Sequence, residues 1–422
     1  MAVWPLLCRL ANLYRRTILR STRVVAVVGS FGKTTTARAV LSALGEAPNP
    51  GVILHVRVWL CATIFRPRPR QRHSVVEVPI TGPGQMARYA HAVRPDIAVV
   101  TAVGSDHNRS LGSLEVTRNE KAEMVRILPV SGLAVLNGDD SNVLWMAGQT
   151  RARVVTFGFG EANDIRATAM KLEWPRGTRF RLLTPMGFHD ICVRLIGRPG
   201  VYATLAAVAV ALNEGFPLDA VIAALEAMEP TQGRLQPVHL TNGAILLRDD
   251  YKSPEEAIHA ALDVLNQIPA RRRIVVMGDI SEPVGRQHVI YRRLGERIGQ
   301  VASRAIFLTS GKNLRVARAG ARTAGLSLAS VISAGKNFRK AVEAVQSDLG
   351  PGDVVLIKGR NTQRLERVAL ALMGRTVRCE LVYCCARYNL CDRCPMIEKN
   401  WQGLWKLVQE SSLTTPTTPL LG

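Results

Sequence analysis

The fold is decided at residues 24–35, which read VVAVVGSFGKTT. The first five residues form an apolar, β-rich run typical of a buried strand, and residues 33–44 carry a helical pattern. A glycine turn between a strand and a helix lets backbone N–H groups approach phosphate oxygens, and the helix N-terminus adds its positive dipole end. The sequence therefore predicts a nucleotide-binding loop at the start of a parallel sheet.

The polar positions of this loop suit a triphosphate. Lys33 would neutralise the β- and γ-phosphates, and Thr34 is placed to put its hydroxyl on Mg²⁺. The spacing is shorter than in the common loop G-x-x-x-x-G-K-[ST], so the prediction depends on the strand-to-helix context, and an ordinary glycine turn is the alternative. The expected cofactors are ATP and Mg²⁺. The residues expected to contact the nucleotide here are Gly29, Ser30, Gly32, Lys33, Thr34 and Thr35.

Length and charge narrow the class of protein. A chain of 422 residues, 47% of them hydrophobic, is too long for one ordinary core and predicts two or three domains. The formal net charge of +22 favours polyanionic partners such as nucleotides or anionic lipid headgroups. The basic residues are scattered, which is typical of solvated faces, so nucleic-acid binding is not expected. The sequence contains no run of about 18 uncharged apolar residues, so no membrane span is predicted.

Strands and helices alternate twice along the chain, which predicts an α/β fold. A parallel-sheet, P-loop ATPase-like central domain is expected over residues 23–234, followed by a Rossmann-like C-terminal domain over residues 235–377. In the first half we expect strands at 24–28, 75–78, 97–103, 133–137 and 154–159, a hairpin at 178–195, and helices at 201–215 and 218–228. In the second we expect strands at 244–247, 274–277, 305–308, 331–333 and 354–357, separated by helices at 255–268, 291–299 and 337–349.

The N-terminal segment, residues 1–22, differs from the rest of the chain. It mixes apolar side chains with arginines such as Arg9 and Arg16, and no acidic residue occurs before Glu46. This pattern predicts a basic amphipathic helix, which either lies on an anionic membrane or docks on the protein's own core. We therefore expect a cytoplasmic protein, with peripheral membrane contact through this helix as one of the two alternatives.

The C-terminal segment, residues 378–422, is first cysteine-rich and then Ser/Thr/Pro-rich, and its last ten residues are predicted to be disordered. Such clustering of cysteines argues against a disulfide framework and for a reducing compartment. A Cys-x2-Cys pair can chelate tetrahedral Zn²⁺, so a structural zinc knuckle is one prediction and a reduced tail without a ligand is the other. The candidate zinc ligands are Cys379, Cys384, Cys391 and Cys394.

Residues 27–35 resemble the ATP loop of the Mur ligase family, enzymes that join a carboxylate to an amine through an acyl phosphate. Further motifs follow in the family's order. Glu77 ends a β-rich run and resembles the acidic Mg²⁺ ligand, and His107 stands in a turn like the one that binds a second Mg²⁺. Lys121, in the segment EKAE, resembles the lysine whose carbamate contacts that metal. The Mg²⁺ ligands that the resemblance implies are Thr34, Glu77, His107 and Lys121.

The resemblance continues into the second half. Asn137 lies in a strand-end motif and is expected at the nucleotide, while Arg234 stands in a Gly-Arg element like the family's hinge and would reach the γ-phosphate. Asp250 resembles the family's Asp-Tyr segment and would hold the ribose or orient the closing domain. Residues 356–360 resemble a later motif, close to the branch that adds D-alanyl-D-alanine. The catalytic residues implied are Lys33, His107, Lys121 and Arg234.

The resemblance implies an ATP-dependent ligase with two substrates, a carboxylate and an amino-acid or peptide amine. The products would be an amide, ADP and phosphate, in cell-wall peptide or related synthesis. Only 23 residues precede the first strand, so a conventional UDP-sugar domain is not expected, and residues 198–202 lack the His-Asn pair that contacts adenine in the family. A folylpolyglutamate- or cyanophycin-type ligase and a non-catalytic nucleotide-binding scaffold are the alternatives.

Overall fold

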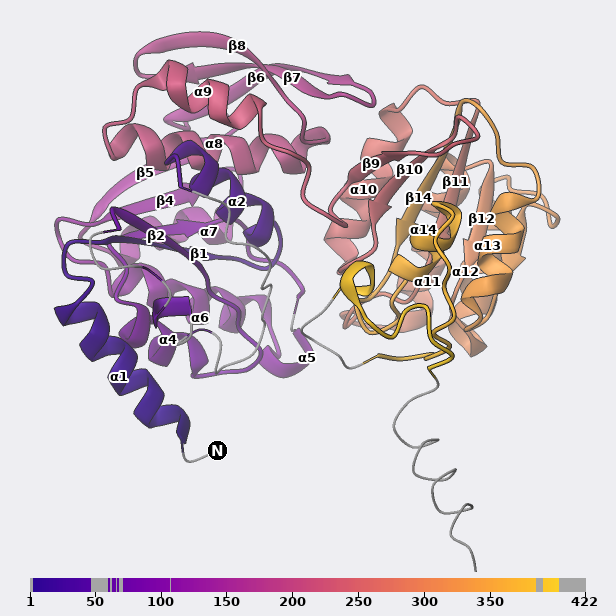
Figure 1. The fold of residues 1–422 in the computed structure, drawn as a ribbon, viewed down its shortest axis with the longest axis horizontal. Coiled ribbons are helices and arrows are strands. Elements are labelled where there is room, and N and C mark those ends of the chain that lie inside the picture. Colours follow the sequence, from indigo (N-terminus) through magenta and orange to yellow (C-terminus); the bar gives the residue numbers. More distant parts are fainter. Residues whose placement is uncertain are drawn as a thin grey trace, which may run out of the picture.

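The computed structural model describes residues 3–46, 60, 63–65, 67, 71–106, 108–384 and 390–401. Figure 1 shows two α/β halves side by side. Within the described residues, the first half is built on an eight-stranded sheet of order β2-β1-β3-β4-β5-β6-β7-β8, and the second on a six-stranded sheet of order β13-β12-β11-β14-β10-β9. The predicted α/β class, a central parallel sheet followed by a Rossmann-like half, is confirmed.

The first sheet is parallel from β2 to β6 and ends in antiparallel strands. All five residues 24–28 are buried, because helices cover both faces of this part of the sheet, and this explains the apolar run without alternation. The strands are β1 (Arg23–Val28), β2 (His73–Glu77), β3 (Ile97–Val100), β4 (Leu133–Asn137), β5 (Arg153–Gly158), β6 (Ile165–Glu173), β7 (Gly177–Thr184) and β8 (Gly187–Val193).

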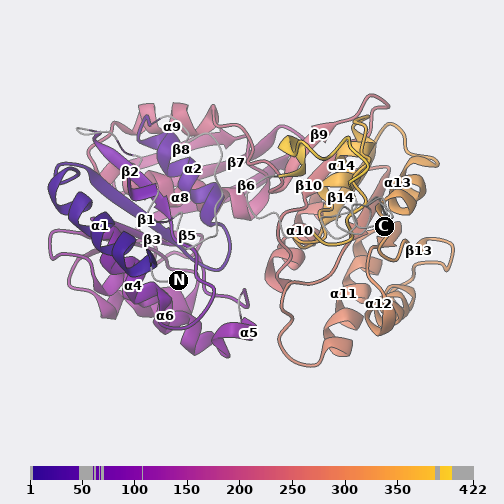
Figure 2. The ribbon, with the colours of Figure 1, turned by 60° about the horizontal axis from the view of Figure 1, so that its bottom comes forward.

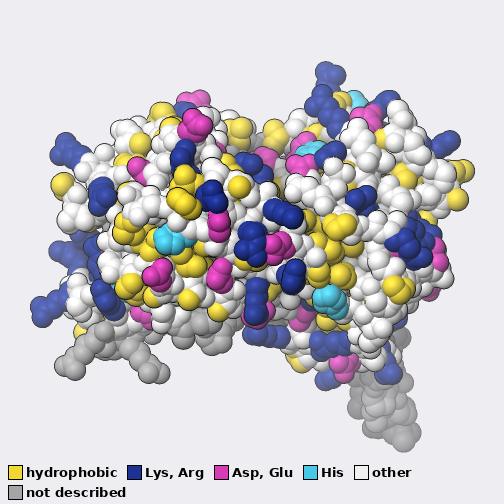
Figure 3. All heavy atoms as spheres, turned by 90° about the horizontal axis from the view of Figure 1, so that it is seen from above, with side chains coloured by type: hydrophobic (Ala, Val, Ile, Leu, Met, Phe, Trp, Pro, Cys, Tyr) yellow, Lys and Arg dark blue, Asp and Glu magenta, His cyan; other side chains and the backbone are white. Residues whose placement is uncertain are grey.

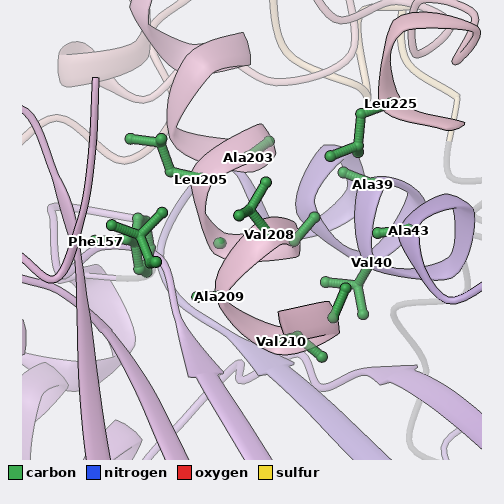
Figure 4. Close-up of a cluster of buried hydrophobic side chains, with 14 of the residues drawn as sticks. Ala39, Val40, Ala43, Phe157, Ala203, Leu205, Val208, Ala209, Val210 and Leu225 are labelled. Atoms are coloured by element: carbon green, nitrogen blue, oxygen red, sulfur yellow. The ribbon is translucent and has the colours of Figure 1, made fainter. Parts of the chain in front are cut away.

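Two layers of helices enclose this sheet. On one face, small side chains of α8 (Gly197–Asn213) let it pack closely on α2 (Lys33–Ala43) and on α9 (Leu218–Glu226), as Figure 4 shows for Ala203, Val208 and Leu225. The other face is covered by α1 (Val3–Thr17), α4 (Gln85–Val93) and α6 (Leu114–Arg126). The short elements are α5 (Asn108–Leu111), α7 (Ser141–Leu144) and η1 (Trp145–Gln149).

The second sheet is parallel except at β9. Its strands are β9 (Gln236–His239), β10 (Ile245–Asp249), β11 (Arg272–Met277), β12 (Arg304–Phe307), β13 (Val331–Ser333) and β14 (Asp353–Lys358). Its helices are α10 (Glu255–Gln267), α11 (Gln287–Val301), α12 (Gly311–Thr323), α13 (Phe338–Gln346) and α14 (Glu366–Leu372). The bounds of β4 and β13 are as predicted, whereas β9, α12 and α14 were not predicted.

The cysteine-rich segment packs on the C-terminal half. Cys379 and Cys391 are buried in the apolar cluster under β14, beside Ile397. Burial raises the pKa of the Cys391 thiol. Among the described residues, no three His, Cys, Asp or Glu side chains come together to hold a metal ion. The predicted zinc site at Cys379, Cys384, Cys391 and Cys394 therefore has no support among the described residues. The last ten residues, 413–422, for which disorder was predicted, lie outside the described residues.

An ion pair fastens this segment to β10. Asp392, in the short helix η2 (Cys391–Arg393), accepts two hydrogen bonds from the Arg248 guanidinium, at 2.8 and 3.1 Å. The third nitrogen of Arg248, Nε, donates to Asp250 Oδ2 at 2.9 Å. Arg248 is only 2% exposed, so both carboxylates are needed to compensate its buried charge.

The contact between α11 and α12 gives a first prediction. A Cβ atom at Gly295 would lie 2.0 Å from the Ala317 carbonyl oxygen. Replacing glycine by alanine inside a helix ordinarily stabilises by about 1 kcal/mol, but here the helices must separate, so we expect Gly295→Ala to lower the free energy of unfolding by roughly 1–3 kcal/mol. Urea unfolding measures it. Gly148→Ala, where no atom lies within 4 Å of the added Cβ, is the matched control and should not destabilise. Equal stability of both variants would contradict the close packing.

The Arg248 ion pairs give a second prediction. Asp392→Asn removes the charge of one of the two carboxylates that pair with the buried Arg248, so we expect a loss of about 2–3 kcal/mol in the free energy of unfolding. Asp263→Asn is the control, because Asp263 pairs with Arg297 at an exposed site and should cost less than about 1 kcal/mol. Chemical denaturation measures the free energy of unfolding of both variants. If Asp392→Asn lost as little stability as Asp263→Asn, the ion pair between Asp392 and Arg248 would not stabilise the fold.

Candidate functional site

The loop between β1 and α2 has the shape expected of a phosphate cradle. Gly29 has φ +150°, and a Cβ there would lie 1.9 Å from Thr101 Oγ1 at the end of β3, so only glycine fits. Gly32 is left-handed, with φ 84°, at the N-cap of α2. Ser30 Oγ accepts a hydrogen bond from the Gly104 amide at 2.9 Å, which fixes the loop against the next strand end.

Lys33 lies under this loop as a buried cation. Its ammonium group donates to the Gly29 carbonyl at 2.6 Å, and 6% of the residue is exposed. Burial, followed by the charge of Lys252, lowers the pKa of Lys33 to about 8. An anion bound in the loop would stabilise the protonated form, since it would supply the negative charge that the folded chain only partly provides.

Thr34 and Glu77 meet at the mouth of the loop. The Thr34 hydroxyl donates to Glu77 Oε2 at 2.8 Å, because Glu77 ends β2 and β2 pairs in register with β1. A hydroxyl and a carboxylate at this place are the oxygen ligands that Mg²⁺ takes beside a nucleotide, so the residues fit the predicted ion. His107, the other predicted metal ligand of the turn, lies outside the described residues.

Lys121 is buried in α6 behind the loop. It is 1% exposed and makes no hydrogen bond to another described residue. Burial, followed by the positive charge of Lys33, lowers the pKa of Lys121 to about 7. A substantial fraction of this lysine is therefore a neutral amine near pH 7, and a neutral amine is the form that reacts with CO₂.

The second half closes over the phosphate end of the site. Lys252 Nζ lies 2.8 Å from Asp106 Oδ2 of the first half. Glu256, at the start of α10, accepts hydrogen bonds from the Ser105 amide at 2.8 Å and hydroxyl at 2.6 Å. These contacts join the two halves directly above the glycine loop.

A cavity of about 840 Å³ lies between the halves, which is a size typical of nucleotide and cofactor sites. Its two ends differ in chemistry. Four of the lining cations lie within range of one another's charge and mark one end: Lys33, Arg234, Lys252 and Lys358. The other end is mainly apolar and aromatic, with Leu195, Ile196, Tyr202 and Val264. The arrangement suits a ligand with a polyphosphate at one end and a flat ring at the other.

The apolar end includes the residues that replace the family's His-Asn pair. The Arg198 guanidinium lies over the Phe159 ring, 3.8 Å from its centroid, and the Tyr202 hydroxyl donates to Asp139 at 2.8 Å. Burial alone would raise the pKa of Asp139, but hydrogen bonds from the amides of Phe159 and Gly160 lower it. Asn137, predicted at the nucleotide, lines the same cavity and donates to the Thr101 carbonyl at 2.9 Å.

Asp250 is not among the residues that line the cavity, which does not support the first of its two predicted roles, contact with ribose. It is 1% exposed and faces Arg248, and one of its oxygens, Oδ1, has no hydrogen-bond partner and lies against Gly233. Burial raises its pKa. Asp249 lines the cavity instead and pairs with Lys358 at 2.6 Å. The position of Asp250 against Gly233, in the Gly-Arg element, is compatible with the other predicted role of Asp250, orienting the closing domain.

Sequence reasoning also missed Lys252 and Lys358 as site residues. Both lie at carboxyl ends of neighbouring parallel strands, because β10 pairs with β14 so that Asp249 is opposite Lys358. One pattern in the sequence could have identified them. Residues 249–252 and 356–360 both lie at the ends of predicted strands, and the carboxyl ends of parallel strands meet at one edge of the sheet. The other predicted site residues that line this cavity are Thr34, Thr35, Glu77 and Arg234.

Comparisons with known proteins agree with this geometry. Residues 27–211 match the Mur ligase middle domain, and residues 233–361 match the Mur ligase, glutamate ligase domain. The UDP-N-acetylmuramoyl-tripeptide–D-alanyl-D-alanine ligase of Escherichia coli strain K12 is 30% identical over 364 residues, 83% of this chain and 76% of the relative. The same-named enzyme of Mycobacterium tuberculosis strain H37Rv is 30% identical over 375 residues, 83% of this chain and 73% of the relative.

Solved structures share the fold. MurF from Acinetobacter baumannii superposes with a TM-score of 0.76 at 22% identity, covering 87% of this chain and 80% of that one. MurF ligase from Thermotoga maritima, solved in complex with ADP, gives 0.76 at 22% identity, covering 88% of this chain and 83% of that one. The chain therefore belongs to the Mur ligase family, and it is an ATP-dependent ligase that forms an amide bond in the synthesis of cell-wall peptide.

Proposed function

We propose that the cavity holds ATP with its phosphates at the cationic end, and that the chain joins a tripeptide carboxylate to the amine of D-alanyl-D-alanine. The observation that carries the proposal is the convergence of Lys33 and Thr34 from the first half with Arg234, Lys252 and Lys358 at one end of the cavity. The amine is inferred from relatives that are named for D-alanyl-D-alanine addition.

The side chains have distinct tasks in this proposal. A carboxylate is a poor electrophile, so ATP must first convert it to an acyl phosphate, which the amine then attacks to form the amide and release phosphate. Two anions repel each other during the first step, and Lys33 and Arg234 would lower that barrier by neutralising the transferred phosphoryl group. The contacts of Lys252 and Glu256 with the first half would exclude water, which would otherwise hydrolyse the acyl phosphate.

Mg²⁺ would be held by Thr34 and Glu77, and it would supply positive charge to the phosphate oxygens when bound. For Lys121 we propose carbamylation: its neutral amine forms a bond to the carbon of CO₂ and loses a proton, which leaves a carboxylate anion. Carbamylation would thus replace a buried positive charge by a negatively charged carbamate, whose oxygen atoms can bind a metal ion behind the loop.

The ligase assignment predicts phosphate release that depends on both substrates. ATP with UDP-N-acetylmuramoyl-tripeptide and D-alanyl-D-alanine should release phosphate, and mass spectrometry should detect the amide. Lys33→Ala removes the cation that stabilises the transferred phosphate, so its rate should fall roughly 100-fold or more. Lys312→Ala, at an exposed position on α12, is the control and should keep the parent rate.

Substrate panels distinguish the alternatives. Product from pteroate and glutamate, with none from the tripeptide, would replace this proposal by the folylpolyglutamate type. A tripeptide without the UDP-sugar, tested beside the complete nucleotide-sugar, shows whether the UDP-sugar is recognised. ATP binding without any product would favour the scaffold.

Carbamylation of Lys121 predicts a spectroscopic signal. Protein equilibrated with ¹³C-bicarbonate should show one slowly exchanging carbamate resonance, because a buried amine with a pKa of about 7 is largely neutral at pH 8. Lys121→Met should abolish the resonance, whereas Lys312→Met should leave it unchanged. A resonance that survives in Lys121→Met would place the carbamate elsewhere.

A further inference from the structure

The helix α1 has two apolar faces, and the fold uses one of them. Leu7, Cys8, Ala11 and Tyr14 pack against the cluster formed with α4 and the first sheet. Arg15, on the same side, is buried and donates to Asp96 Oδ2 at 2.6 Å. The expectation that this segment docks on the protein's own core is therefore met by this face.

The second face points away from the protein. Leu6, Leu10 and Leu13 are 56%, 45% and 58% exposed. Their spacing of four and three residues places them on one side of the helix. Ile18, just after the helix, adds a fourth exposed apolar side chain at 47%. Exposed leucines are common singly, but a helical row of three is the pattern of a helix that meets an apolar phase.

Arginines accompany this row. Arg9, Arg16 and Arg20 are exposed and form no ion pair with any described residue, in contrast to Arg15. No acidic residue occurs in the chain before Glu46. A row of leucines with unpaired arginines beside it matches the chemistry of an anionic lipid surface, whose acyl region takes the leucines and whose headgroups take the guanidinium groups.

We propose that α1 binds the surface of an anionic lipid bilayer through Leu6, Leu10 and Leu13, with Arg9, Arg16 and Arg20 at the headgroups. The contact is peripheral, and a helix able to span a bilayer is not found among the described residues. Figures 1 and 2 both place α1 at the end of the first half that is remote from the second half. The cavity between the halves thus stays accessible when α1 lies on a membrane.

Flotation of the full chain with vesicles tests the surface. Binding should be strong to vesicles of phosphatidylcholine with phosphatidylglycerol and weak to phosphatidylcholine alone. Replacing Arg9, Arg16 and Arg20 by Ala should weaken binding to the anionic vesicles roughly tenfold or more, since each basic residue near such a surface adds attraction. Leu10→Ser with Leu13→Ser should weaken it to a similar extent, while the thermal melting temperature and ATP hydrolysis stay unchanged.

The matched control removes the same charge elsewhere. Lys312, Arg315 and Arg322 are exposed on α12, in the second half, and α12 presents no exposed row of leucines. Figure 3 shows that basic side chains are spread over both halves of the face that it draws, so net charge alone must be controlled for. The triple Ala variant of α12 should bind anionic vesicles within about twofold of the parent.

Three results would overturn the proposal. The first is no binding of the full chain to anionic vesicles at low salt. The second is an equal loss in the α1 and α12 variants, which would mean adsorption through net charge. The third is a dimer in sedimentation velocity that the leucine substitutions dissociate, without vesicle binding, which would make a second copy of the chain the occupant. None of these results bears on the ligase proposal, because α1 contributes nothing to the cavity.

Discussion

Burial of positive charge where the two halves meet is the constraint on which the site depends. Lys33, Lys121 and Lys358 are almost inaccessible, and burial lowers the pKa of each. An ammonium group in such surroundings is tolerated only near carbonyl or carboxylate oxygens or a bound anion. The folded chain supplies part of this from the Gly29 carbonyl and from Asp249. In the proposed function, phosphate would supply the rest, and the glycine loop and the ends of two sheets converge on the one cavity where it would bind.

The sequence predicted the parts of the site that are local. Gly29, Lys33 and Thr34 lie within one strand, turn and helix, whose pattern is visible without any long-range contact. The parts that it missed depend on which strands become neighbours. Lys358 reaches the cavity only because β14 pairs with β10, and no pattern within residues 353–358 specifies that partner.

Two predicted ligand roles lack support for a related physical reason: the contact of Asp250 with ribose and the zinc site of the cysteines. Asp249 and Asp250 are adjacent in the chain, but successive residues of an extended strand face opposite sides, so one carboxylate faces the cavity and the other faces Arg248. Cys391 and Cys394 are spaced as zinc ligands are, yet Cys391 is buried among apolar side chains under β14. In both cases the residue type indicated a ligand, whereas the surroundings of the side chain depend on which way the strand or segment faces in the folded chain.

The contacts between the halves are unlike on the two sides of the cavity. At the apolar end, Ile196 and Trp174 of the first half join the hydrophobic cluster that contains Val264. At the phosphate end, the contacts are the Lys252 to Asp106 pair and the Glu256 to Ser105 hydrogen bonds. Breaking the polar contacts costs little free energy, because water replaces the lost hydrogen bonds. Separating the apolar contacts costs more, because it exposes hydrocarbon surface to water. From this difference we infer that the two halves would separate more readily at the polar, phosphate end of the cavity than at the apolar end, where a nucleotide base would stay covered.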